Sequence, residues 1–378
     1  MKRHAEIAGG GFGGLIAAIA LAQRGWTVRV HERTPFIRAE GFGIAIHQNG
    51  IKVLEALGVF EAIRKGAMRV GYSDRWNARG EHTARFPVKR TYRISRHLMV
   101  QELASTAQSL GVEILTDSPV AGADASGELV LESGRRLRAD LVIGADGYNS
   151  KVRDSLGLLR KRNMLRDGAM RMVIPRAADE TAYEPEQGAP SNEYWSGTRR
   201  IIYNACARDE IYIAMSALND DAEAKHTPIR VDAWKKSFPH IEGLFDRIHD
   251  HTDWERVKYV QFQIIKLKRW SQGRVAILGD AANAMPPNLG QGGGVAMMNA
   301  LALAVHLESE PDLDRGLARW EATERPLTEH TQRWSWLYSA ITFWPDALRS
   351  LAFGATGRFD WLRAQYQRTS NHIPTGCS

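Results

Sequence analysis

Residues 5–32 read AEIAGGGFGGLIAAIALAQRGWTVRVHE, and this stretch decides the fold. Its apolar start, 5–8, predicts a short strand that runs into a glycine-rich turn. A helix over 15–24 follows, and a second apolar strand over 27–31 leads to Glu32. A strand, a helix and a second strand in this order predict a βαβ unit of the Rossmann-like type.

The glycines of the turn follow the spacing Gly9-x-Gly11-x-x-Gly14, and Glu32 lies 23 positions after the first of them. Gly9 allows the tight turn, Gly11 lets backbone approach a pyrophosphate, and Gly14 permits close helix packing. The helix N-terminus stabilises the phosphate charge, and Glu32 accepts hydrogen bonds from a ribose. A turn selected for packing alone is the alternative, and the motif by itself does not separate FAD from NAD.

Two further strands end in a pair of glycine and aspartate. Residues 137–153, LRADLVIGADGYNSKVR, contain an apolar strand that ends at Asp146-Gly147. Residues 274–282, RVAILGDAA, contain another that ends at Gly279-Asp280 and continues through a glycine-rich stretch into a helix. Asp280 can accept a hydrogen bond from a ribityl hydroxyl, and glycine backbone can lie close to an isoalloxazine ring. These are the contacts of a flavin.

In this order the three motifs resemble those of class A flavoprotein monooxygenases, the para-hydroxybenzoate hydroxylase-like family, and the resemblance covers essentially the whole chain. It implies a bound FAD, with NADH or NADPH as electron donor, NADH being the expected one, and with O₂ forming a C4a-hydroperoxyflavin. The residues expected to contact the cofactor are Gly9, Gly11, Phe12, Gly13, Gly14, Glu32, Arg33, Arg38, Arg96, Asp146, Asp280, Pro287, Gly290, Gly292 and Gly293. Asn283, Gly294 and Asn299 stand where the family commonly has His, Asn and Asp, which leaves the backbone contacts intact.

The expected fold class is α/β, with a Rossmann-like FAD-binding domain interleaved with an antiparallel-sheet substrate domain. The FAD-binding domain is expected to combine 1–70, 96–165 and 268–345, and the substrate domain to combine 71–95 and 166–267, before a C-terminal helical segment over 346–378. Alternating patterns predict strands at 171–175, 192–195, 201–206 and 211–216, followed by helix over 231–249 and a strand over 257–267. Such a sheet would cover the isoalloxazine ring.

Within that family the stretches 167–176 and 200–212 are similar to those of the pyridine-ring hydroxylases typified by 2-methyl-3-hydroxypyridine-5-carboxylic acid oxygenase. Carried over by position, the residues that line the substrate pocket are Tyr72, Arg171, Arg200, Tyr212 and Tyr259. An arginine that faces an apolar pocket is best explained by a carboxylate partner, because an unpaired buried guanidinium is costly. The alternative is that the arginines are solvated strand residues and the tyrosines pack in the core.

The resemblance therefore implies an oxygenase for a small anionic aromatic, a 3-hydroxypyridine-carboxylate first, with ring cleavage left open. The alternatives are a salicylate- or hydroxybenzoate-type hydroxylase and a flavin-dependent dehydrogenase or reductase without oxygenation. A flavin-binding module without enzymatic activity ranks below these, because the pocket arginines would then have no task.

The composition argues against nucleic acid, metal ions and a membrane as partners. The 378 residues carry a net charge of +7 from scattered basic residues, without the basic run or recognised module of a nucleic-acid-binding protein. Cys206 and Cys377 cannot form a disulfide framework or a zinc site, so no metal is expected. The sequence shows neither a signal peptide nor an apolar run of about twenty residues, so we expect a cytoplasmic protein without a membrane partner. Whether it forms a homo-oligomer is left open.

Overall fold

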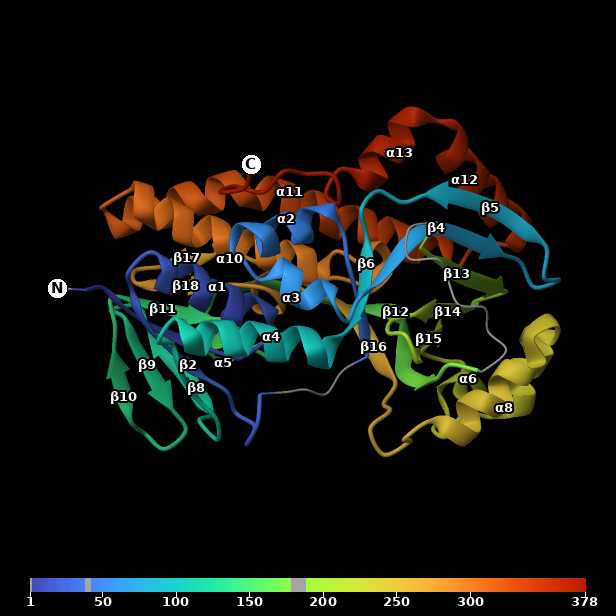
Figure 1. The fold of residues 1–378 in the computed structure, drawn as a ribbon, viewed down its shortest axis with the longest axis horizontal. Helices are drawn as coiled ribbons and strands as arrows, with labels where there is room; N and C mark the ends of the chain where they lie inside the picture. Colours follow the sequence, from blue (N-terminus) through green and yellow to red (C-terminus); the bar gives the residue numbers. More distant parts are fainter. Residues whose placement is uncertain (1, 38–41, 178–187) are drawn as a thin grey trace.

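The structure, a computed structural model, describes residues 2–37, 42–177 and 188–378. In Figure 1 a sheet that contains β1, β2, β11, β17 and β18 lies on the left, and a second, larger sheet lies on the right. The long helix α11 (Leu313–Ile341) runs along the upper side.

A six-stranded sheet forms the left-hand core, in the order β17-β18-β11-β1-β2-β7. Its strands are β1 (His4–Ala8), β2 (Thr27–His31), β7 (Glu113–Leu115), β11 (Leu141–Gly144), β17 (Ser271–Gln272) and β18 (Val275–Ile277). All neighbours pair in parallel except the edge strand β17. Parallel strands are buried on both faces, which explains why β11 and β18 are continuous apolar runs. The carboxyl ends of β1, β2, β11 and β18 therefore meet at one edge.

Helices cover this sheet. They are α1 (Phe12–Gln23), α2 (Gln48–Ala56), α3 (Phe60–Arg64), α4 (Arg96–Ser109) and α10 (Gly292–Ser309). Helix α1 packs on α4 and α10 and is buried from Phe12 to Leu21, as expected of a helix that is apolar all round. A small antiparallel sheet of β8 (Val120–Asp124), β9 (Glu128–Leu131) and β10 (Arg136–Arg138) lies at the lower left, with α5 (Lys151–Ser155) packed on β8.

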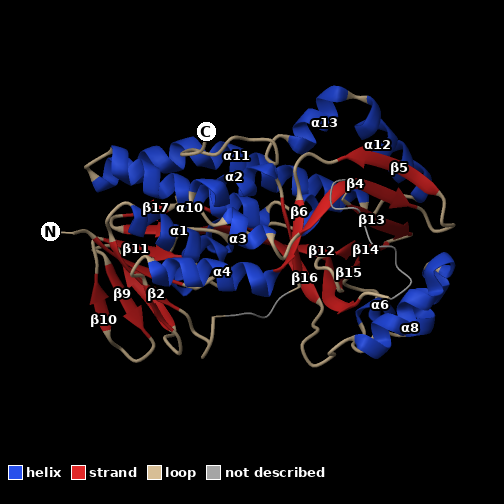
Figure 2. Ribbon diagram, viewed as in Figure 1, coloured by secondary structure: helices blue, strands red, loops and turns tan. Residues whose placement is uncertain are grey.

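The second sheet has nine strands in the order β16-β12-β15-β14-β13-β4-β6-β3, with β5 paired to β4. They are β3 (Gly43–Ile46), β4 (Met68–Trp76), β5 (His82–Pro87), β6 (Tyr92–Ser95), β12 (Leu159–Pro175), β13 (Ala189–Ser196), β14 (Arg199–Ala205), β15 (Glu210–Leu218) and β16 (Val260–Leu267). Neighbours are antiparallel apart from β4 and β13. Figure 2 shows this sheet on the right, with helices at its lower and upper margins.

The remaining helices complete the two margins of the second sheet. Below lie α6 (Ala222–Lys225), α7 (Val231–Ser237), η1 (Pro239–Ile241) and α8 (Glu242–His251), which bury Trp234, Phe238 and Phe245 against the sheet. Above lie α12 (Asp346–Arg358) and α13 (Asp360–Gln367). The short α9 (Asp280–Asn283) and η2 (Pro287–Leu289) join β18 to α10. No helix among the described residues has both the length and the apolar character that a membrane span needs.

The predicted α/β class and the pairing of a Rossmann-like domain with an antiparallel sheet are confirmed. Several elements differ from the expectation. The helix predicted over 231–249 is broken into α7, η1 and α8, and the strand predicted over 257–267 begins only at Val260 as β16. Helix α1 begins at Phe12 rather than at residue 15, because Gly11 already serves as its N-cap. Strand β12 begins at Leu159, twelve residues before the predicted start at 171, since its polar first half pairs with β16 and stays largely exposed.

Candidate active site

The three sequence motifs meet at the carboxyl edge of the parallel sheet. Gly9 follows β1, the segment Ala145–Asp146 follows β11, and Gly279 follows β18. Gly9 has φ +103, and a Cβ there would lie 2.4 Å from the carbonyl oxygen of Ala145, so the turns after β1 and β11 touch. A Cβ on Gly14 would lie 2.0 Å from the carbonyl oxygen of Gly9. Both positions therefore require glycine.

The space in front of this edge suits the predicted FAD. Gly11, the N-cap of α1, and Gly292, the first residue of α10, both line a cavity, and a Cβ on either would meet no atom within 4 Å. Each thus leaves room for a group close to the backbone at a helix N-terminus, where anions and acceptor oxygens are stabilised. Phe12 and Gly13 line the same cavity.

Glu32 clamps the glycine turn. Its Oε2 accepts a hydrogen bond of 3.0 Å from the backbone N–H of Gly10, and its Oε1 accepts from the backbone and hydroxyl of Thr34. Arg33 is exposed and does not line the cavity, and Arg38 lies outside the described residues. The carboxylate therefore fixes the turn, and Glu32 does not line the cavity, so its contact with a ribose stays a prediction.

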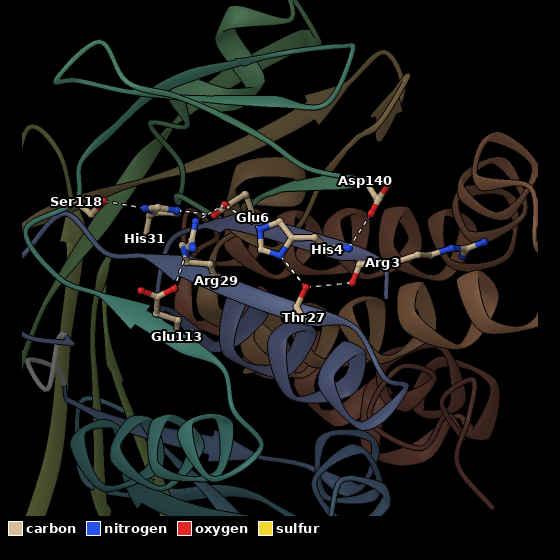
Figure 3. Close-up of polar contacts among 9 residues, drawn as sticks. All are labelled: Arg3, His4, Glu6, Thr27, Arg29, His31, Glu113, Ser118 and Asp140. Atoms are coloured by element: carbon tan, nitrogen blue, oxygen red, sulfur yellow. Dashed lines mark hydrogen bonds and ion pairs between the residues drawn. The ribbon is translucent and has the colours of Figure 1, made fainter. Parts of the chain in front are cut away.

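A second buried carboxylate, Glu6, holds β2 in place behind Glu32. Figure 3 shows Glu6 at the centre of a polar cluster, with His31 Nε2 2.7 Å away and Arg29 Nη1 3.0 Å away. The other nitrogen of His31 lies 2.8 Å from the Ser118 hydroxyl. Burial alone would raise the pKa of Glu6, but its hydrogen bonds and positive neighbours lower it. None of these four residues lines the cavity, so the Ser–His–Glu arrangement serves the sheet.

Asp280 and the glycine-rich loop after it form the next wall. Asp280, Pro287, Gly290, Gly292 and Gly293 all line the cavity, and Gly290 adopts φ +63. Asp280 is accessible from the cavity although protein surrounds it, and this enclosure raises the pKa of its carboxyl against the opposing effect of Arg96 and Arg171. A carboxyl group at a helix start, beside two guanidinium groups, suits the hydroxyls of a ribityl chain.

Arg96 and Asp146 occupy different positions relative to this wall. Arg96 begins α4 and lines the cavity, with its guanidinium carbon 5.0 Å from the centre of the Phe12 ring. Asp146 lies beside the cavity: its Oδ2 accepts hydrogen bonds from the backbone of Lys151 and Val152 at the start of α5. Its Oδ1 is buried and accepts no hydrogen bond from the described residues, and burial raises the pKa of its carboxyl. Its contact with a cofactor stays a prediction, because Asp146 does not line the cavity.

The cavity has a volume of about 1620 Å³. It is lined by the glycine turn, by the glycine-rich loop over 287–293, called the flavin loop below, by strands β12, β14 and β15, and by helices α11, α12 and α13. The far end is the part that these helices line. Its side chains are mostly apolar, including Trp334, Leu337, Ile341 and Phe353, but Arg75 and Tyr338 also line the cavity beside Phe353. Single ligand sites commonly measure roughly 300–1,000 Å³, so this cavity has room for a cofactor and a second molecule.

The structure brings three of the five predicted substrate residues to the cavity. Arg171, Arg200 and Tyr212 line it. Tyr72 on β4 lies under the guanidinium of Arg85, 4.0 Å from the ring centre, and does not line the cavity. Tyr259 lies just before β16 and also does not line it; its hydroxyl is within hydrogen-bond distance of the carbonyl oxygen of Ala217 and of Asn219 Oδ1.

Arg200 already has a carboxylate partner within the protein. Its Nε lies 2.6 Å from Glu193 Oε1, and its Nη1 donates a hydrogen bond of 2.8 Å to Asn288 in η2. Glu193 is also 3.5 Å from Arg75 Nε, and it accepts a hydrogen bond from the Tyr338 hydroxyl. Burial alone would raise the pKa of Glu193, yet Arg200 and Arg75 hold it below its usual value. One buried carboxylate therefore neutralises part of two buried guanidinium charges.

Arg171 differs from Arg200. It lines the cavity and lies 5.7 Å from the ring centre of Phe262, and no hydrogen bond or ion pair joins it to any of the described residues. Its charge lowers the pKa of Asp280. An arginine in this position can bind an anionic group of a ligand.

Sequence reasoning missed His47 and Arg93, which also line the cavity. His47 Nδ1 lies 3.1 Å from the Thr91 hydroxyl, and burial together with Arg93 lowers the pKa of His47 to about 4. Arg93 donates a hydrogen bond of 2.7 Å to the Ser191 hydroxyl, and burial lowers its pKa to about 10. The available signal was weak: His47 stands alone at the junction of β3 and α2, outside the three motifs.

The chain is similar to known proteins in sequence and in structure. Residues 3–321 match the family described as FAD binding domain. The chain is 39% identical to a putative 2-heptyl-3-hydroxy-4(1H)-quinolone synthase of Rhodococcus erythropolis, over 99% of this chain and 97% of that protein. It is 37% identical to a 2-heptyl-3-hydroxy-4(1H)-quinolone synthase of Mycobacteroides abscessus, over 94% and 95%. A crystal structure of 2-methyl-3-hydroxypyridine-5-carboxylic acid oxygenase superposes with a TM-score of 0.88 at 33% identity, over 100% of this chain and 99% of that one.

Proposed function

The chain belongs to the FAD-binding domain family of FAD-dependent monooxygenases, and from that premise we propose that it adds one oxygen atom to the ring of a 4-quinolone that carries an alkyl chain. NADH or NADPH supplies the electrons, and O₂ supplies the oxygen atom. The relatives named for such a product match this chain over nearly its whole length, which supports the choice of ring.

The observation that carries this proposal is the shape of the cavity. Beside the flavin loop it is lined by polar side chains, among them His47 and Arg93, and its far end is walled by apolar side chains of α11 and α12. The fused ring, with its N–H group and its exocyclic oxygen, fits the polar part, and an alkyl chain fits the apolar part, where its burial contributes roughly 0.8 kcal/mol per CH₂ group. A small carboxylate would leave that apolar end without a ligand group.

The protein side chains have separate tasks in this reaction. When bound, FAD supplies the redox chemistry and the activation of oxygen. The helix N-termini at Gly11 and Gly292 would hold its charged and acceptor groups, and Asp280 would accept from its ribityl hydroxyls. Strands β12, β14 and β15 line the same cavity and would exclude water from the space beside the bound cofactor.

We assign His47 as the acceptor of a hydrogen bond from the ring N–H. Its low pKa keeps the imidazole neutral at pH 7, so one nitrogen has a free lone pair. A hydrogen bond to that nitrogen raises the electron density of the quinolone ring, which favours attack by its carbon 3 on an electrophilic oxygen. Arg93, whose charge lowers the pKa of His47, would stabilise the negative charge that develops on the quinolone oxygen.

A second candidate substrate, a hydroxypyridine carboxylate, is favoured by one observation. Arg171 faces the cavity and forms no ion pair with the described residues, so it can bind a carboxylate. The structural similarity to 2-methyl-3-hydroxypyridine-5-carboxylic acid oxygenase supports the same reading.

Oxidation of NADH by the FAD-loaded protein tests both candidates. We expect 2-heptyl-4(1H)-quinolone to stimulate it and to yield a product heavier by one oxygen atom. Stimulation by hydroxypyridine carboxylates with no response to the quinolone would transfer the proposal to the second candidate. NADH oxidation without an oxygenated product from either compound would contradict the proposed function.

A further inference from the structure

Large apolar side chains face solvent on the last helices of the chain. Leu348, Leu351, Phe359 and Trp361 are all exposed, and Leu351 and Trp361 have 69% and 66% of their surface accessible. We call these four residues the α12–α13 apolar patch. Single exposed apolar residues are ordinary, but a cluster of four within fourteen positions indicates an interaction surface.

The outward side of α12 forms a continuous apolar stripe. Ala347, Leu348, Leu351 and Gly354 are exposed, and their spacing of three and four residues places them on one side of a helix. Figure 1 shows α12 and α13 at the upper right margin of the molecule. An ordinary surface helix has the opposite arrangement, with its apolar side turned inward.

The inward side of the same helices borders the candidate active site. Ala352, Phe353 and Thr356 of α12, and Leu362 and Tyr366 of α13, line the cavity. One layer of helix therefore separates the apolar end of the cavity from the α12–α13 apolar patch. A molecule held on the patch would be a helix diameter away from the site, roughly 10 Å.

The charged side chains near the patch are mainly positive, which favours an anionic partner. Arg333, Arg358 and Arg368 on α11, α12 and just after α13 are exposed. The two acidic residues from 344 to 368, Asp346 and Asp360, each form an ion pair with an arginine of their own helix. In a twofold contact between copies the same surface meets itself, so these positive charges would face one another. An anionic lipid surface instead attracts them, and tryptophan side chains favour the interface between lipid and water.

We propose that α12 and the start of α13 dock on an anionic lipid surface and that an alkyl-bearing substrate passes from the lipid into the cavity. The docking itself stands on the patch, and the second step rests on the proposed function. The sequence led us to expect no membrane partner because it contains no spanning segment. Docking on a lipid surface needs only a cluster of exposed apolar side chains, and the sequence alone does not say which apolar side chains are exposed.

Co-sedimentation of the FAD-loaded protein with vesicles tests the docking. We expect binding to vesicles of phosphatidylcholine with phosphatidylglycerol, weaker binding to phosphatidylcholine alone, and loss of binding at high salt. The double variant Leu351→Glu with Phe359→Glu should lose at least about tenfold in affinity for the anionic vesicles. The matched control is Leu110→Glu, which alters a residue that is 40% exposed beside α4 at the other end of the molecule and should bind as the parent does.

Two results would overturn the docking: a parent protein that does not sediment with anionic vesicles, or a double variant that sediments as well as the parent. A double variant that changes the molar mass in light scattering, with no vesicle binding by the parent, would assign the patch to a second copy of the chain. Failure of the proposed function is recognised separately, because vesicle binding needs no turnover. If both stand, vesicles loaded with the alkylquinolone should raise turnover in the parent but not in the double variant, and a short-chain soluble quinolone should be oxidised equally by both.

Discussion

The sharing of Glu193 by two arginines predicts an unequal response to mutation. In Glu193→Gln the buried guanidinium groups of Arg75 and Arg200 both lose their carboxylate, and breaking a buried ion pair in this way costs about 3–5 kcal/mol. In Arg200→Met, Glu193 keeps Arg75 and the Tyr338 hydroxyl, so the loss is the hydrogen bond to Asn288 and one ion pair, about 1–3 kcal/mol. Glu193→Gln should therefore be the more destabilised variant.

Urea unfolding of the FAD-loaded proteins at neutral pH measures this difference. The matched control is Arg230→Met, which breaks an exposed pair with Glu223 and should cost at most about 1 kcal/mol. Because the folded pKa of Glu193 is lowered, its contribution is present above the usual carboxyl pKa and is lost as the pH falls through the folded value, and Glu193→Gln should lack this dependence. If Arg200→Met is destabilised as much as Glu193→Gln, the carboxylate is not shared and the reasoning fails.

Three further predictions concern the cavity wall. Gly11→Ala should fold normally and lose at least about tenfold in FAD affinity, because its Cβ would enter the space left for the cofactor; fluorescence titration of the apoprotein measures this. Gly14→Ala should instead lower the soluble yield of folded protein, because its Cβ would meet the Gly9 carbonyl. Since the pKa of folded His47 is about 4 and that of the unfolded chain about 6.5, lowering the pH from 7 to 5 should cost up to about 2 kcal/mol of stability, and a His47→Gln variant with the same acid response would contradict this. Arg171→Gln should raise the KM of a hydroxypyridine carboxylate about tenfold and leave that of an uncharged quinolone unchanged, while an equal rise for both would show that Arg171 serves the cofactor.

The fold was predictable because its signals are local. The glycines from Gly9 to Gly14 allow a tight turn that larger residues would block, and an apolar run such as β11 is typical of a parallel strand buried on both faces. The substrate residues were harder, since a side chain's partner depends on strand register. Tyr259 was expected in the pocket, but β16 begins one residue later, and the structure places its hydroxyl near Asn219, a contact that no motif encodes.

The pairing of Glu193 with Arg200 could have been found from the sequence with one more step. Strands 192–195 and 201–206 were both predicted, and a short hairpin between them sets the register. In the structure Glu193 faces Ile202 and Trp195 faces Arg200, so Glu193 and Arg200 are diagonal neighbours on one face of the sheet. Deducing that register would have identified Arg200 as paired within the protein and left Arg171 as the better candidate for an anionic ligand.

The excess of positive charge near the flavin loop acts on both the cofactor and the proposed substrate. Arg93, Arg96 and Arg171 line the cavity there, and Asp280 opposes them with a carboxyl whose pKa burial raises. In a region of low dielectric constant, an excess of positive charge favours anions over their neutral acids. On the proposed function, bound FAD would bring two phosphates to this region, and a quinolone whose ring N–H donates to His47 would develop negative charge on its oxygen. The same positive charge would stabilise both, so neutralising Arg93 should slow oxygenation more than it weakens FAD binding.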